Sequence, residues 1–164
     1  MKRFLFAIGA AFLIMACTTT HKTNNIQNMD RIREALVEAC KQMEMKAREM
    51  DMKGVAVASV LPKDSQNDWI AEMKVVDKTF NAEDSEQGWN LVAIAWSKAG
   101  EVIVSGADSG NPDRKCMIGE LNYVGGAYDE NDAYKFAFAF SGGTSEDDLE
   151  VAKYGIECLK SLLK

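Results

Sequence analysis

The sequence predicts an α+β domain with a helix at each end of the folded region and short strands between them. Apolar residues recur at helical spacing over Met29–Lys53, aromatic and small residues alternate over Tyr134–Ser141, and a second helical stripe follows over Leu149–Leu162. With 164 residues, 47% of them hydrophobic and 27% charged, the chain is long enough to bury one apolar core.

The beginning of the chain resembles the signal peptide of a bacterial lipoprotein. Lys2 and Arg3 precede an apolar run, Phe4–Ala16, that is too short to span a bilayer as a helix. The run ends in Leu13–Cys17, and a small residue directly before a cysteine resembles the lipobox. This resemblance implies cleavage before Cys17 and attachment of lipid to it. An ordinary signal peptide or a short buried helix is the alternative.

A lipid anchor would place the protein in the cell envelope. Thr18, not Asp, follows the cysteine, and by analogy with known sorting rules this favours the outer membrane, facing the periplasm or the surface. The chain then consists of a signal peptide over residues 1–16, a polar tether over 17–28 and a folded domain over 29–164.

The charge of the chain limits its partners. Removing Lys2 and Arg3 lowers the 19 basic residues to 17 against 25 acidic residues, which gives a net charge of −8. An acidic chain lacks the basic surface that nucleic-acid binding requires. Anionic lipid would also repel it, so we expect the acyl anchor to hold it at a membrane.

Two strands are predicted after the first helix. Gly54 is expected to end the helix, as a glycine at the C′ position does. Val55–Leu61 is an apolar, β-branched run typical of a buried strand, and Trp69–Val76 is a second strand. A polar turn separates the two strands, so we expect them to form a hairpin.

Methionine is frequent in the second half of the first helix. Because methionine fits irregular gaps, filling of the core is the first interpretation. A soft wall or an axial ligand for a planar cofactor is the alternative. The residues are Met43, Met45, Met50 and Met52.

The segment Gly88–Gly106 is ambiguous. Local propensity favours a hairpin with strands over Trp89–Trp96 and Val102–Ser105. A helix would contain Gly100 in its interior, at a cost of about 1 kcal/mol. It would also place six residues on one face: Leu91, Ile94, Ala95, Lys98, Ala99 and Val102.

The last part of the chain gives the most consistent local signals. We expect a short strand over Met117–Val124, a turn at Gly125–Gly126 and the strand Tyr134–Ser141. One face of that strand is aromatic and the other is small, so a helix could lie close to the small face. Gly142–Gly143 predicts a turn, and Thr144 predicts the N-cap of the closing helix.

These residues resemble the GlcG/HbpS-like family of small heme-binding and related domains, which includes the C-terminal domain of PduO-type proteins. Three segments carry the resemblance: the first helix running into Val55–Val60, Ile94–Ala99, and Phe138–Ile156. It implies a small antiparallel sheet flanked by helices, similar to profilin, in the order α-β-β-α-β-β-α. It also implies that Trp89–Val104 is a helix and that the protein is a homo-oligomer. Lys74–Lys78 departs from the family pattern.

The residue inventory argues against catalysis. The only histidine is His21, in the predicted tether, so a Ser-His or Cys-His catalyst or a histidine-based metal site inside the domain is excluded. No phosphate-binding or dinucleotide-binding fingerprint is present. Asp147 and Asp148 are expected to lie in a solvated first helical turn. We therefore expect neither an enzyme nor a metal site.

Four residues are candidates for ligand binding. The turn at Gly142, Gly143 and Thr144 precedes a helix N-terminus, where backbone N–H groups can meet a carboxylate. A purely structural capped turn is the alternative. Lys98 matches a family position and is expected at the edge of its helix face, pairing with a carboxylate of a ligand or of a neighbouring subunit.

The sequence therefore favours a lipid-anchored envelope domain that binds a small ligand without catalysis. Heme or another tetrapyrrole is one candidate, and without a histidine its iron would need a Met, Cys or Tyr ligand. An oligomeric interaction module without a ligand is the alternative. Cys40 and Cys158 are expected to be small buried apolar residues, and the odd count of Cys40, Cys116 and Cys158 cannot pair completely within one chain.

Overall fold

The structure is a computed structural model that describes residues 29–65, 67–82 and 87–164. The predicted signal peptide, Cys17 and the tether lie outside these residues. The chain divides into two compact units, 1–34 and 35–164, and the second unit is described below. No helix in the described part is both long and apolar enough to cross a membrane.

Helices and short strands follow one another in the predicted α+β order. A first helix, residues 29–49, is followed by the strands and the helices α2 and α3. The remaining elements are β1 Gly54–Pro62, β2 Ile70–Val76, β3 Phe80–Asn81, β4 Trp89–Asn90, α2 Leu91–Ser105, β5 Gly126–Glu130, β6 Tyr134–Ser141 and α3 Ser145–Leu162.

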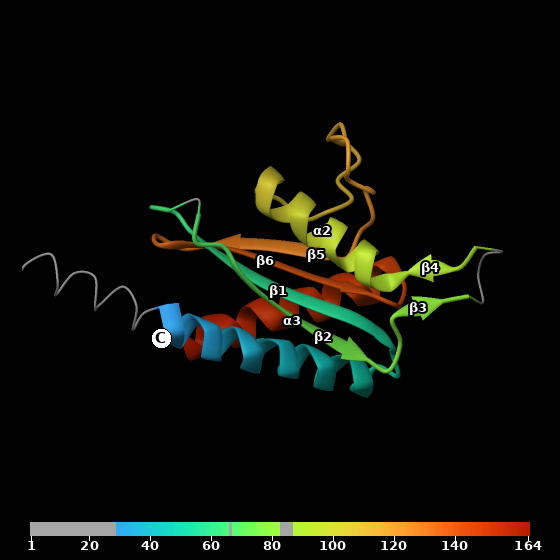
Figure 1. The fold of residues 1–164 in the computed structure, drawn as a ribbon, viewed down its shortest axis with the longest axis horizontal. Helices are drawn as coiled ribbons and strands as arrows, with labels where there is room; N and C mark the ends of the chain where they lie inside the picture. The colour runs from blue at the N-terminus through green and yellow to red at the C-terminus, as the bar shows by residue number, and fades with distance from the viewer. Residues whose placement is uncertain (1–28, 66, 83–86) are drawn as a thin grey trace, which may run out of the picture. The chain divides into compact units, whose positions relative to one another are not determined.

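Four strands form one antiparallel sheet in the order β2-β1-β6-β5 (Figure 1). Strand β1 pairs with β2, as predicted for a hairpin, so that Val57 lies opposite Met73. On its other side β1 pairs with β6, where Val57 lies opposite Ala139. Strands β3 and β4 form a separate pair, which the sequence did not predict. The α+β fold class with a small antiparallel sheet is confirmed.

The two faces of β6 explain how helices cover the sheet. Phe136, Phe138 and Phe140 are fully buried, and Gly155 of α3 lies so close to Phe138 that a Cβ would collide with the ring. The opposite face is small, and Ala139 packs there in a cluster with residues of α2. Helix α2 thus covers one face of the sheet, while α3 and residues 35–49 of the first helix lie along the other (Figure 1).

The ambiguous segment is a helix, as the family resemblance implied, and the hairpin favoured by local propensity is wrong. Asn90 caps α2 by accepting a hydrogen bond from the backbone N–H of Ala93 at 3.0 Å, and Gly106 ends it with φ 67°. Five residues predicted to face inward are buried: Leu91, Ile94, Ala95, Ala99 and Val102. Burial of this stripe against β1 and β6 overrides the local β propensity.

Two local predictions are wrong. The segment 117–124 is not a strand: Gly119 and Asn122 have φ values of 100° and 55°, which interrupt an extended backbone, and the strand begins at Gly126 instead. Gly54 does not end the first helix. Asp51 takes the left-handed conformation there with φ 55°, and Gly54 opens β1, where a Cβ would collide with the carbonyl oxygen of Ser141.

Cysteine burial agrees with the prediction in one of two cases. Cys40 is buried, and this burial raises the pKa of its thiol to about 12. Cys158 is only partly buried. Within the described residues, Cys40, Cys116 and Cys158 are all free thiols.

Candidate functional site

A cavity of about 820 Å³ lies where the first helix ends and where α2 and α3 begin. Small-molecule sites usually occupy about 300–1,000 Å³, so the cavity is large enough for a cofactor-sized ligand. It is lined by Met50, Asp51, Met52, Lys53, Lys78, Asn81, Trp89, Leu91, Ile94, Lys98, Tyr123, Val124, Ser141, Gly142, Gly143, Thr144, Ser145, Asp147 and Asp148.

The four residues that the sequence selected for ligand binding all line this one cavity. Lys98 comes from the middle of α2, while Gly142, Gly143 and Thr144 form the turn between β6 and α3. The antiparallel pairing of β1 with β6 brings this turn next to the end of the first helix, so segments distant in sequence meet at one place.

Lys98 and Asp148 form a buried ion pair at the cavity. The Lys98 ammonium donates to Asp148 Oδ2 at 2.7 Å and to the backbone carbonyl of Phe140 at 2.9 Å. The two residues are only 3% and 4% exposed. The sequence placed Lys98 at the edge of its helix face and Asp148 in solvent, and both placements are wrong. Gly125 makes room for the pair, because a Cβ there would lie 2.6 Å from the Lys98 nitrogen.

Burial sets the electrostatics of this pair. Desolvation lowers the pKa of Lys98 and raises the pKa of Asp148, and the attraction between the two groups opposes both shifts. Each shift favours the neutral form of its group because charge is poorly solvated inside a protein. Burial therefore brings the pKa values of these two groups closer together than in an exposed ion pair.

The glycine turn already holds a carboxylate from its own chain. The backbone N–H of Gly143 donates to Asp148 Oδ1 at 2.9 Å. Thr144 caps α3 as predicted, accepting from the N–H of Asp147 at 3.3 Å and donating to its carboxylate at 2.8 Å. Positive φ occurs at Gly142, at 153°, where a Cβ would collide with the carbonyl oxygen of Lys53. Asp148 thus connects the turn to α2.

One part of the remaining cavity wall is aromatic and aliphatic. The rings of Trp89 and Tyr123 meet edge to face with centroids 6.1 Å apart. Leu91, Ile94 and Met52 add buried apolar surface. Apart from the Lys98–Asp148 pair, the described lining carries two lysines, Lys53 and Lys78, and two aspartates, Asp51 and Asp147. The cavity therefore combines an aromatic and aliphatic patch with a larger polar lining whose charges balance.

Known proteins share the fold of this chain. A crystal structure of HbpS superimposes with a TM-score of 0.51 at 15% identity, over 76% of this chain and 86% of that one. Protein ORFY of Klebsiella pneumoniae, of the family DUF336, gives 0.52 at 20% identity, over 76% and 89%. The chain has the GlcG/HbpS-like fold. A crystal structure of a PduOC–heme complex gives 0.42 at 14% identity, over 80% and 91%.

Comparison by sequence adds no relative. No family model matches the chain, and no curated protein matches it. The resemblance inferred from the sequence motifs is thus confirmed at the level of the fold.

Three lining residues of this GlcG/HbpS-like domain were missed as site residues. Trp89 lay in the ambiguous segment, Tyr123 lay in a segment predicted as a strand, and Asp148 was expected in solvent. Asp148 lies one helical turn beyond the N-cap, where a carboxylate can turn back to the preceding glycines, but neighbouring acids share that turn. The aromatic pair has no local signature because 34 residues separate its members.

Proposed function

We propose that the GlcG/HbpS-like domain binds a small planar ligand in this cavity without catalysis, and that heme or another tetrapyrrole is the ligand class. The observation that carries the proposal is the combination of a cavity of about 820 Å³ with the edge-to-face wall of Trp89 and Tyr123. Aromatic faces and aliphatic side chains suit a flat, largely apolar ring system. The resemblance in the sequence supports a tetrapyrrole.

The cavity contains side chains of the chemical types that can ligate the iron of a tetrapyrrole. Met50, Met52 and Tyr123 line it, and a thioether or a phenolate is an established axial ligand of heme iron. Lys53 and Lys78 also line the cavity, as do Asp51 and Asp147, so the lining charges outside the Lys98–Asp148 pair sum to zero. When bound, the group itself would supply the redox chemistry. The residues of the chain would hold it and shield it from water.

A hemin titration of the full-length protein tests this proposal. Saturable binding should shift the Soret band, and Tyr123→Phe or the pair Met50→Leu with Met52→Leu should alter the spectrum according to which residue ligates iron. Tyr154→Phe and Met117→Leu are matched controls, because neither residue lines the cavity. A spectrum that shows only non-saturable partitioning of hemin would remove the tetrapyrrole from the proposal.

We propose that the protein is a lipoprotein of the cell envelope, anchored through Cys17. The support is the basic pair, the apolar run and the small residue before the cysteine. Cys17→Ser should release the folded protein from membranes, as measured by fractionation after a high-salt wash. A variant that still sediments with membranes would contradict the lipid anchor.

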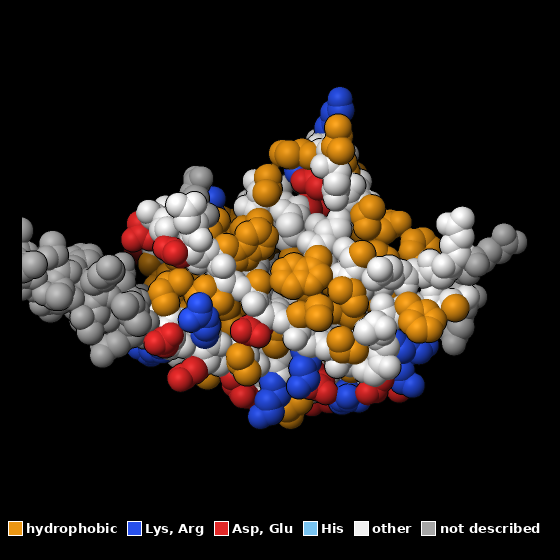
Figure 2. Space-filling model, in the orientation of Figure 1, with side chains coloured by type: hydrophobic (Ala, Val, Ile, Leu, Met, Phe, Trp, Pro, Cys, Tyr) orange, Lys and Arg blue, Asp and Glu red, His pale blue; other side chains and the backbone are white. Residues whose placement is uncertain are grey.

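The second candidate function is an oligomeric module of the envelope. Met73 and Val75 of the edge strand β2 lie opposite Val57 and Val55, so they share the sheet face that α2 covers farther along. Helix α2 packs over β1, β6 and β5, and both β2 side chains stay exposed. Figure 2 shows hydrophobic side chains gathered across this part of the molecule.

A second copy of the chain would cover this strip. Trp96 follows the buried Ala95 in α2, and its side chain is exposed. It offers an aromatic contact of the kind that is enriched in interfaces. Light scattering should give at least a dimer, and Val75→Lys should shift it to monomer, whereas Val104→Lys, on an exposed position of α2, should not. A monomeric unmodified protein would exclude this candidate.

A further inference from the structure

We infer that Lys98 and Asp148 form a reactive amine–carboxylate pair that captures a small uncharged aldehyde as an imine. This inference rests on the cavity of the proposed function and names a second, covalent class of ligand for it. The sequence did not predict this pair, because its two residues lie 50 positions apart. The expected partner of Lys98 was a carboxylate of a ligand or of a neighbouring subunit.

The geometry distinguishes Lys98 from the other lysines. Within the described part of the chain it is the buried lysine, at 3% exposure, and it still lines the cavity. An ammonium has three N–H donors. Asp148 and the Phe140 carbonyl take two of them, at 2.7 and 2.9 Å, which fixes the nitrogen at the cavity wall.

The surroundings favour the neutral amine that the reaction needs. Burial lowers the pKa of Lys98 and raises that of Asp148, so transfer of a proton from the ammonium to the carboxylate is easier than at the surface. Asp148 is itself oriented by the N–H of Gly143, which holds its other oxygen at 2.9 Å. A desolvated lysine beside a proton acceptor is the usual arrangement for attack on a carbonyl.

The chemistry balances within the pair. Asp148 accepts one proton from the Lys98 ammonium, and the nitrogen lone pair then attacks the carbonyl carbon to form a carbinolamine. The protonated Asp148 returns its proton to the departing hydroxyl group, which leaves as water. The products are a protonated imine on Lys98 and an ionised Asp148, so the charges at the start and at the end are equal and neither an oxidant nor a reductant is required.

The charges of the lining give no preference for a charged aldehyde. The other charges of the described lining, Lys53, Lys78, Asp51 and Asp147, balance one another, so they give no preference for an anion. Leu91 and Ile94 of α2 precede Lys98 on the same helix and present apolar surface to the cavity. A short alkyl aldehyde fits this environment.

Reductive trapping of the full-length protein tests the inference. Acetaldehyde and sodium cyanoborohydride at neutral pH convert each imine into a stable ethylamine, and peptide mapping by mass spectrometry gives the rate at every lysine. We expect Lys98 to react at least about tenfold faster than the exposed Lys115. Equal or slower reaction of Lys98, or reaction only in urea, would overturn the inference without requiring any variant.

Two further measurements assign the roles. Asp148→Asn should slow trapping at Lys98 by about a hundredfold, the lower end of the contribution of a positioned general base. Circular dichroism checks that this variant is folded, and the unchanged rate at Lys115 checks the reagent. Hemin added beforehand should protect Lys98. If Lys98 is trapped and hemin does not protect it, the imine inference stands and the tetrapyrrole proposal is rejected. If hemin binds but Lys98 is not trapped, the tetrapyrrole proposal stands and the imine inference is rejected.

Discussion

Helix α2 carries two almost completely buried charges, Lys98 and Glu101, and their surroundings differ. Lys98 joins α2 to β6 and α3 through two short hydrogen bonds. Glu101, at 2% exposure, accepts from the N–H of Gly110 at 3.0 Å and lies 3.6 Å from the guanidinium of Arg114. Its Oε2 has no hydrogen-bond partner among the described residues. One charge connects regular elements, and the other lies beneath a loop.

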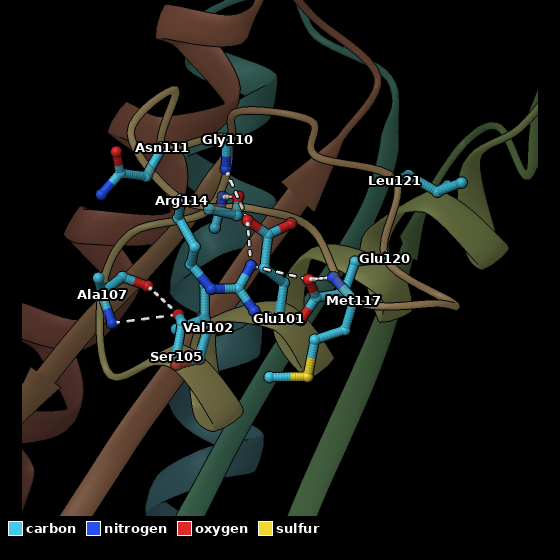
Figure 3. Close-up of polar contacts among 12 residues, drawn as sticks. Glu101, Val102, Ser105, Ala107, Gly110, Asn111, Arg114, Met117, Glu120 and Leu121 are labelled. Atoms are coloured by element: carbon cyan, nitrogen blue, oxygen red, sulfur yellow. Dashed lines mark hydrogen bonds and ion pairs between the residues drawn. The ribbon is translucent and has the colours of Figure 1, made fainter.

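The loop above Glu101, residues 107–125, contains an ion-pair cluster of its own around Arg114. Figure 3 shows Arg114 between Glu101 and Glu120, and it forms two bonds to Glu120, at 2.7 and 2.5 Å. The same carboxylate accepts from the N–H of Met117 at 2.7 Å. The comparison teaches that burial of a charge does not by itself couple elements: coupling requires partners from different elements, which Lys98 has and Arg114 mostly lacks.

The largest effect is expected when the Lys98–Asp148 pair is broken on one side. Asp148→Ala leaves a buried ammonium without its counter-charge and should lower the free energy of unfolding by roughly 3–5 kcal/mol. Urea denaturation measures the change. Glu146→Ala, an exposed acid in the same helical turn, is the matched control and should change little.

Removing both charges sharpens this result. Lys98→Met combined with Asp148→Leu places apolar groups of similar size in the same space and should recover most of the loss, as buried ion pairs replaced by apolar residues often do. A double variant as unstable as Asp148→Ala alone would show that packing around the glycines, not the unpaired charge, causes the loss.

Two glycines with positive φ give the next comparison. Gly142, with φ 153°, lies in the turn before α3, and Gly119, with φ 100°, lies in the loop above Glu101. Both resist a Cβ through backbone strain, which costs about 1–3 kcal/mol. At Gly142 a Cβ would also collide with Lys53, whereas at Gly119 nothing lies within 4 Å. Gly142→Ala should therefore lower the melting temperature more than Gly119→Ala, and equal decreases would contradict this.

The loop should respond locally rather than globally. Arg114→Ala should speed amide hydrogen exchange over residues 107–123 and leave exchange in β6 unchanged. Arg114 holds the pKa of Glu120 below its ordinary value of 4.5. The contribution of this pair is therefore present above that value and is lost as the pH falls through the lower pKa of the folded state. Protection of the loop that does not decrease as the pH is lowered below 4.5 would argue against the pair.

The sequence predicted the parts of this comparison that depend on local chemistry. The alternation in β6, the glycine turn and the Thr144 cap all lie within a few residues of one another, and the structure confirms each of them. The face of α2 was predicted once the family resemblance replaced the propensity argument. Lys98 was selected for the site, although for the wrong partner.

The missing parts depend on distances in space that no local pattern records. Asp148 looked like any acid in a first helical turn, because the glycine that makes room for the buried ammonium, Gly125, is 23 residues away and was expected only to form a turn. Tyr123 lay in Met117–Val124, which was predicted as a short strand. Its role in the cavity follows from the position of the loop above α2, which Ser97 fixes by accepting from the N–H of Leu121 at 3.1 Å.

The smallest effect is expected at Glu101. Glu101→Gln keeps an oxygen for the N–H of Gly110 and replaces a buried charge by a neutral amide, while Arg114 retains Glu120. Because no buried counter-charge is left alone, the free energy of unfolding should change by less than about 1 kcal/mol. Urea denaturation of Glu101→Gln and Asp148→Ala in parallel compares the stability contributions of the two buried charges at α2. A loss as large as that of Asp148→Ala would mean that Glu101, and not the Arg114–Glu120 pair, holds the loop to the helix.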